Sequence, residues 1–121
     1  MAEKRIILEM GTGNDLYGQD YTKAARRAVQ DALHHSSITL FAKLGIDHSE
    51  MRVDVTIGVQ QPDQVDCDLV AADLPRGRAT VRAVLGGLDV HDGADSKHVV
   101  ATAAVEAWLP DQAANYRLSD R

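Results

Sequence analysis

The sequence of 121 residues has little of the material that holds small secreted or metal-bound domains together. It contains one cysteine, Cys67, which excludes an internal disulfide and fits a reducing, cytoplasmic compartment. Aromatic residues are also scarce, with one Phe, one Trp and three Tyr. The core must then be built from small aliphatic side chains, each of which removes little area from water. Such a chain favours close packing against other subunits, so we expect a homo-oligomer.

Other absences narrow the function. The 18 acidic residues exceed the 13 basic ones, and the formal charge of −5 argues against a nucleic-acid partner. No apolar run approaches the ~20 residues that span a membrane, and the segment "MAEKRIILEM" lacks the pattern of a signal peptide. His34 and His35 point about 100° apart on a helix, and the remaining histidines stand singly. We therefore expect no metal site and no cofactor.

Hydrophobic periodicity predicts an α+β protein with the order β-α-β-α-β-β. The expected elements are a strand over 4–10, a helix from 21 to 44, a strand over 51–60, a helix over 62–74, and strands over 79–85 and 98–109. The last segment contains four alanines, so a helix remains an alternative prediction for it. These elements form a single domain, 1–109, with one sheet covered by two helices, followed by a polar tail, 110–121. The other face of the sheet needs a cover, and another copy of the chain is the simplest one.

The stretch "EMGTGNDLYGQD" is predicted to be a glycine-rich loop between the first strand and the first helix, with Asp20 as the helix N-cap. Its Gly-x-Gly lacks the third glycine of a dinucleotide fingerprint, and Asp15 and Asp20 would repel phosphate. Two readings stay open. The glycines either allow positive φ angles in a plain loop, or their N–H groups form the floor of a pocket for a carboxylate or carbonyl.

Several polar residues accompany this loop and define a candidate ligand site. Its members are Gly11, Thr12, Gly13, Asn14, Asp15, Asp20, Lys23, Arg76 and Arg78. Arginine suits bidentate capture of carboxylates or imides, although both arginines can instead pair with the acidic helix before them. Glu9 precedes the loop in an apolar strand and is the candidate acid or base. Ser36 or Ser37 beside a histidine offers a nucleophile only if geometry permits, and Cys67 among carboxylates should not be reactive.

The runs "EMGTGNDLYGQDYTKAARRAVQDALHHSS", "MRVDVTIGVQQPDQVD" and "LPRGRATVRAVLGGLDV" closely resemble a Lin-type family of small bacterial conserved hypothetical proteins, over about Lys4 to Leu109. That family has no established activity. It is itself similar to YjgF-type deaminases, small trimeric chorismate mutases and ring-opening amidohydrolases. This resemblance implies a trimer or larger ring with ligand sites between subunits. No serine–lysine pair of the amidohydrolases stands at a matching position.

Two functions follow from these observations. One is a homo-oligomeric enzyme or binding protein for a small anionic or imide-like metabolite. The other is an assembly module without catalysis, in which the glycine-rich stretch makes subunit contacts. The polar residues beside the glycine-rich stretch motivate the first hypothesis. The composition, poor in aromatic residues, and the apolar strands motivate the second.

Overall fold

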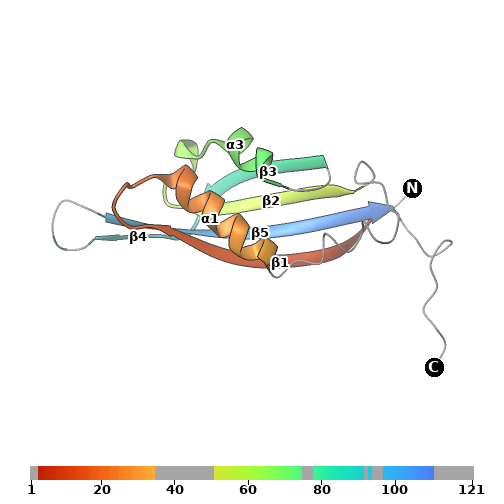
Figure 1. The fold of residues 1–121 in the computed structure, drawn as a ribbon, viewed down its shortest axis with the longest axis horizontal. Coiled ribbons are helices and arrows are strands. Elements are labelled where there is room, and N and C mark those ends of the chain that lie inside the picture. The colour runs from red at the N-terminus through yellow and green to blue at the C-terminus, as the bar shows by residue number, and fades with distance from the viewer. Residues whose placement is uncertain (1–2, 35–50, 75–77, 92, 94–96, 111–121) are drawn as a thin grey trace, which may run out of the picture.

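A computed structural model of the chain describes residues 3–34, 51–74, 78–91, 93 and 97–110. Its elements, in chain order, are β1 (Glu3–Asp15), α1 (Tyr21–His34), β2 (Arg52–Val59), the 3-10 helix η2 (Pro62–Gln64), α3 (Cys67–Ala72), β3 (Arg78–Leu85), β4 (Leu88–His91) and β5 (Lys97–Pro110). All of the strands belong to one sheet, and the helices lie against it (Figure 1).

Strand β5 is the centre of the sheet. It pairs antiparallel with β1 along one edge, and with β2 and then β4 along the other. Strand β3 lies beyond β2 and runs parallel to it. A parallel pair needs a crossover connection, which η2 and α3 supply here. The sheet is therefore mixed, with the order β1-β5-β2-β3 and with β4 continuing the edge of β5 past the end of β2.

One face of the sheet is buried under the helices. Alternate residues of the two central strands point toward α1 because side chains in a strand alternate between faces. The buried ones are Val53, Val55, Ile57 and Val59 of β2, and Val99, Ala101, Ala103, Val105, Ala107 and Leu109 of β5. Helix α1 contributes Tyr21, Ala24, Ala25, Ala28, Val29 and Ala32. The core is therefore built from small aliphatic residues, as the composition predicts.

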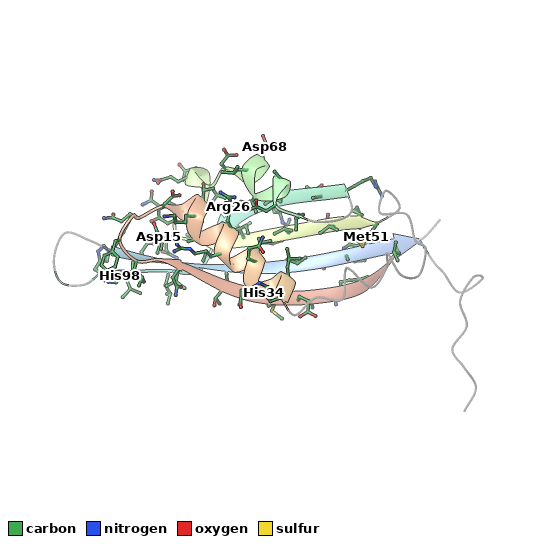
Figure 2. All side chains as sticks on the ribbon, in the orientation of Figure 1. Asp15, Arg26, His34, Met51, Asp68 and His98 are labelled. Atoms are coloured by element: carbon green, nitrogen blue, oxygen red, sulfur yellow. The ribbon has the colours of Figure 1, made fainter. Side chains whose placement is uncertain are left out.

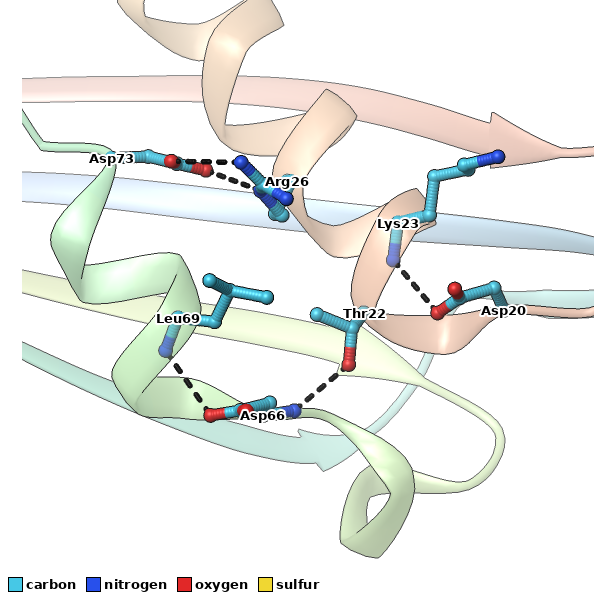
Figure 3. Close-up of polar contacts among 7 residues, drawn as sticks. All are labelled: Asp20, Thr22, Lys23, Arg26, Asp66, Leu69 and Asp73. Atoms are coloured by element: carbon cyan, nitrogen blue, oxygen red, sulfur yellow. Dashed lines mark hydrogen bonds and ion pairs between the residues drawn. The ribbon is translucent and has the colours of Figure 1, made fainter.

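The two helices are tied to each other by polar contacts (Figure 3). Arg26 of α1 makes a two-pronged bond to Asp73, with N–O distances of 2.7 and 3.1 Å. The backbone N–H of Asp66 donates to the Thr22 hydroxyl at 2.9 Å, and the Asp66 carboxylate caps α3 by accepting from the Leu69 N–H at 3.1 Å. These bonds join α1 and α3 into one layer over the sheet.

The structure confirms the α+β class, the single domain and one sheet with its helices. It also confirms Asp20 as the cap of α1 and resolves 98–109 as strand rather than helix. The continuation of the first helix over 35–44, Arg76 and the tail over 111–121 lie outside the described residues. The likeness to YjgF-type and chorismate-mutase folds stays a prediction.

Three element predictions are wrong in detail. Residues 11–15 are not a loop but the end of β1, because they continue the ladder with β5. The helix predicted over 62–74 is divided into η2 and α3, since Asp66 has extended backbone and starts a new helix. A further strand, β4, follows the Gly86–Gly87 bend, so the order is β-α-β-α-β-β-β.

Candidate functional site

The glycines of "GTG" pack against a helix. Gly11 and Gly13 lie on the covered face of β1, directly beneath α1. A Cβ added at Gly11 would come within 2.4 Å of the Ala28 carbonyl oxygen, and one added at Gly13 within 2.3 Å of the Ala28 nitrogen. Since those atoms are backbone, no side-chain rotation can make room. The two glycines allow strand and helix to approach closely, and Ala24 and Ala32 face them from the helix.

The two aspartates of the stretch hold the turn between β1 and α1. The Asp15 residue is only 5% exposed, and its carboxylate accepts the backbone N–H of Asp20 at 2.8 Å. The guanidinium of Arg27 lies 3.8 Å from that carboxylate and donates to the Asn14 carbonyl at 2.5 Å. Asp20 in turn accepts the backbone N–H of Lys23 at 3.0 Å and so caps α1. Both carboxylates have structural partners in this turn.

The other candidate residues lie apart from one another. Thr12 and Asn14 alternate with the glycines and are exposed on the face of β1 away from α1. Lys23 is exposed on α1, whereas Glu9 is half-buried opposite Val105 on the covered face. Arg78 begins β3, where its N–H donates to the Met51 carbonyl at 2.8 Å. The described candidates are therefore divided between the two faces of the sheet.

The face of the sheet away from the helices is here called the open face. Its residues are Arg5, Leu8, Met10, Thr12 and Asn14 of β1, His98, Val100, Thr102, Ala104, Glu106 and Trp108 of β5, Arg52, Asp54, Thr56 and Gly58 of β2, Arg78, Thr80, Arg82 and Val84 of β3, and Leu88 and Val90 of β4. Its most exposed apolar side chains are 40% to 68% exposed, namely those of Leu8, Met10, Val84, Leu88 and Val90, whereas Val100 and Trp108 are half-buried. The end near β4, where Figure 2 labels His98, carries Leu88, Val90 and Val100 beside the polar Asn14 and His98. The charged Arg52, Asp54 and Glu106 lie toward the other end, where Figure 2 labels Met51.

A groove of about 530 Å³ crosses the middle of the open face. Its floor consists of small residues, where Thr56 pairs with Ala104 and Gly58 with Thr102 across β2 and β5. One wall is formed by Met10 and Thr12 of β1, and the other by Val84, Leu85 and Gly86. The groove is hollow because the floor residues are small and the residues on both sides are larger. Its surface is mostly aliphatic, with a few hydroxyl groups.

A polar hollow of about 240 Å³ adjoins the groove and shares Thr56 with it. Asp54 and Glu106 lie directly opposite each other there, on β2 and β5. Like charges in that position repel. Each carboxylate has its own arginine, since Arg5 lies 3.1 Å from Glu106 and Arg52 contacts Asp54. Arg82 of β3 donates through its Nε to the Thr56 hydroxyl at 3.2 Å.

A second polar cluster lies on the covered side, where β4 and β5 meet the start of α1. The Tyr21 hydroxyl donates to Asp89 Oδ2 at 2.5 Å, and Lys97 Nζ lies 3.3 Å from the same oxygen. Burial and the bond to Asp89 raise the pKa of Tyr21, while the Tyr21 hydroxyl and Asp89 raise the pKa of Lys97. Tyr21 is therefore a hydrogen-bond donor at neutral pH, and the cluster joins three elements.

The described residues also bear on whether the chain has a reactive thiol, a metal site or a membrane-spanning helix. Burial and the neighbouring Asp68 and Asp66 raise the pKa of the Cys67 thiol, which agrees with the sequence-based expectation that it is unreactive. In the part of the chain that the structure describes, no cluster of three His, Cys, Asp or Glu residues could hold a metal ion. Within the same ranges, no helix is long and apolar enough to cross a membrane.

The groove was not predicted from the sequence. Its floor consists of the outward positions of two strands that the sequence did predict, and those positions carry small residues instead of the usual large polar ones. Thr56 and Gly58 in β2, with Thr102 and Ala104 in β5, form this pattern. A run of small residues at alternate strand positions was the available signal, but the pairing of the two strands was needed to use it.

Comparison with known proteins places the chain in a family. A family model described as "Conserved hypothetical protein (Lin0512_fam)" matches residues 5–107. The crystal structure of a protein from Nostoc punctiforme, described as FtsZ-like and of unknown function, is similar with a TM-score of 0.78 and 37% sequence identity. That similarity covers 92% of this chain and 99% of the other. No curated protein matches. The chain therefore belongs to the Lin0512 family of conserved hypothetical proteins.

Proposed function

We propose that the chain is a homo-oligomeric binding protein whose copies meet through the open face and hold a small metabolite in the groove. The observation that carries this proposal is the exposure of large aliphatic side chains on that face. Met10 is 68% exposed, Leu88 60% and Val90 45%. Scattered exposed residues need no explanation, but a contiguous apolar patch marks an interaction surface. The covered face of the same sheet has its cover within the chain, and the open face lacks one among the described residues.

The size of the open face suits a second copy. Four strands lie side by side across it, in the order β1-β5-β2-β3. At about 4.8 Å per strand and about 3.3 Å per residue over roughly ten residues, the projected area is roughly 600 Å². A stable interface of standard size buries about 800 Å² on each partner, and accessible area exceeds projected area. The family resemblance implies a trimer or larger ring, which is the form of assembly that we propose.

The groove gives the assembly a binding role. A second copy placed over the open face would enclose the groove and exclude water from it. Ligand pockets are commonly apolar hollows with a few well-placed polar groups, and typical volumes are roughly 300 to 1,000 Å³. The groove, at about 530 Å³ with hydroxyls at Thr12, Thr56 and Thr102, has this character. A small anionic or imide-like metabolite remains the proposed ligand class.

The test is the mass of the protein in solution after a charge is placed on the open face. Ala104 lies in the centre of that face, and Ala104→Arg would bury an unpaired charge between copies. Light scattering should then give a smaller mass than for the wild type. The matched control is Ala72→Arg, at an exposed position of α3 on the other side of the molecule. A monomeric wild type, or an unchanged mass for Ala104→Arg, would overturn the proposal.

The second candidate is an assembly module that binds no metabolite. It is favoured by the residues between β1 and α1, because Asp15 and Asp20 accept backbone N–H groups there. Gly11 and Gly13, in β1, pack against α1 and are not available to a ligand. A thermal-shift screen of carboxylates, imides and cyclic ureides at millimolar concentration separates the two candidates. A ligand of the native assembly raises the melting temperature, whereas the assembly module gives no shift with any compound.

A further inference from the structure

We infer that the groove accepts an amphipathic carboxylic acid, with the apolar body over the groove floor and the carboxylate on Arg82. This inference rests on the proposed function, because it names the ligand of the same groove. It also moves the expected anion contact from the start of β3 to its middle. Arg82 lies between the groove and the polar hollow, next to the shared residue Thr56.

The groove itself selects an apolar body. Its floor is made of Gly58, Ala104 and the methyl-bearing threonines, and its walls are Met10, Val84 and Leu85. The charged residue on its lining is Asp31, whose carboxylate accepts the backbone N–H of Thr12 at 3.0 Å at the β1 edge. Among the described residues that line the groove, a ligand charge would therefore find no cation. Burying a charge without a partner is costly, so the ligand charge must lie at an end of the groove.

Arg82 supplies the partner at one end. Its Nε donates to the Thr56 hydroxyl at 3.2 Å, which orients the planar guanidinium. Within the described ranges this is its one hydrogen-bond partner, so the terminal amino groups are available for an oxygen pair. Guanidinium and carboxylate groups match in a bidentate geometry. Arg82 and Val84 are two residues apart on one face of β3, about 6.6 Å, which is within the length of a short aliphatic chain.

The carboxylates near Arg82 are paired with other arginines and do not neutralise its positive charge. Asp54 and Glu106 line the same hollow, and a carboxylate ligand would be repelled by them if they were unpaired. Arg52 contacts Asp54, and Arg5 lies 3.1 Å from Glu106, so each of these charges has a partner of its own. The positive charge of Arg82 is the uncompensated one of this set. Charge complementarity therefore favours an anionic head group at this position.

The experiment compares octanoate with 1-octanol, which have the same chain and differ in charge. Binding is measured by calorimetry with the wild type, Arg82→Gln and the control Arg26→Gln, whose arginine pairs with Asp73 on the helix side. We expect the wild type and Arg26→Gln to prefer octanoate. Loss of a charge-assisted bidentate contact should weaken octanoate binding about tenfold or more in Arg82→Gln, with octanol unchanged.

The outcomes separate this inference from the proposed function. Equal binding of octanoate and octanol, or octanoate binding that survives Arg82→Gln, overturns the role of Arg82 and leaves the groove as a site. Binding of neither compound overturns the amphipathic ligand. Light scattering on the same samples measures the mass of the assembly. The proposed association through the open face is therefore tested independently of ligand binding.

Discussion

At the scale of single residues, Gly13 shows how closely strand β1 packs against helix α1. A Cβ at this position would lie 2.3 Å from the Ala28 nitrogen and 2.5 Å from the Ala24 carbonyl oxygen. Real atoms of these types do not approach so closely, so the helix must move away from the strand to admit a methyl group. That movement would loosen the contacts of Ala24, Ala28 and Ala32 with β1 and β5, which are the centre of the core.

Gly13→Ala should therefore lower the free energy of unfolding by about 3 kcal/mol, at the upper end of the usual cost of overpacking. The control is Gly58→Ala on the open face, where the nearest atom is the rotatable Thr102 hydroxyl at 2.7 Å. Urea denaturation monitored by circular dichroism measures both changes. If Gly13→Ala costs no more than Gly58→Ala, then α1 does not rest on the backbone of β1 as described.

The same residues show what the sequence could and could not predict about a site. A Gly-x-Gly after a strand is common to ligand loops and to strands that pack closely under a helix. The deciding feature is in the partner element, where Ala24, Ala28 and Ala32 repeat every four residues and form a smooth helix face. The pairing of that face with the glycines is a tertiary contact. Sequence reasoning therefore found the unusual residues and misassigned their backbone.

At the scale of elements, the cluster of Tyr21, Asp89 and Lys97 fastens the β4–β5 pair to the start of α1. Each residue comes from a different element, and the Tyr21 hydroxyl and Lys97 ammonium meet at one carboxylate oxygen. Strand β4 has only four residues and was not predicted, since such a short segment after a glycine pair has no clear periodicity. It forms because β5 extends beyond the end of β2 and leaves an edge to pair with. Strand β2 was predicted from its alternation, and β5 was predicted from its Val and Thr content.

Tyr21→Phe should destabilise the protein at neutral pH by about 1 to 3 kcal/mol, because a bond to a charged group is lost. The loss should shrink at alkaline pH. Burial raises the pKa of Tyr21 in the folded state, so above pH 10, its ordinary value, the unfolded chain releases this proton first. The stability contributed by Tyr21 is thus complete below pH 10 and declines as pH rises through the folded pKa.

Urea denaturation from pH 8 to 11.5 checks this dependence. The wild type should lose stability more steeply than Tyr21→Phe above pH 10. Lys97 contributes a decline of the same sign above its ordinary pKa of 10.5, and that decline should also be smaller in the variant because the Tyr21 hydroxyl is its largest cause. Parallel stability curves for the two proteins across this range would show that the Tyr21–Asp89 bond does not form in solution.

At the scale of the whole molecule, we propose that the open face is covered by other copies of the chain. The alternation in β2 indicates one buried and one polar face, and the sequence also indicates that the sheet needs a second cover. Sequence reasoning could not place the apolar patch on that face, because the patch is assembled from β1, β3 and β4 only when the strands are in register. Its members include Met10, Val84 and Leu88.

The oxidation rate of Met10 tests whether other copies of the chain cover this face. The Met10 residue is 68% exposed in a single chain, whereas Met51 is 1% exposed and serves as the folded-core reference. Thioether oxidation follows exposure, and mass spectrometry can time it at each residue after peroxide is added. We predict that Met10 is oxidised several-fold more slowly in the wild-type assembly than in Ala104→Arg, with Met51 slow in both. Equally fast oxidation of Met10 in the two proteins would show that other copies of the chain do not cover the open face.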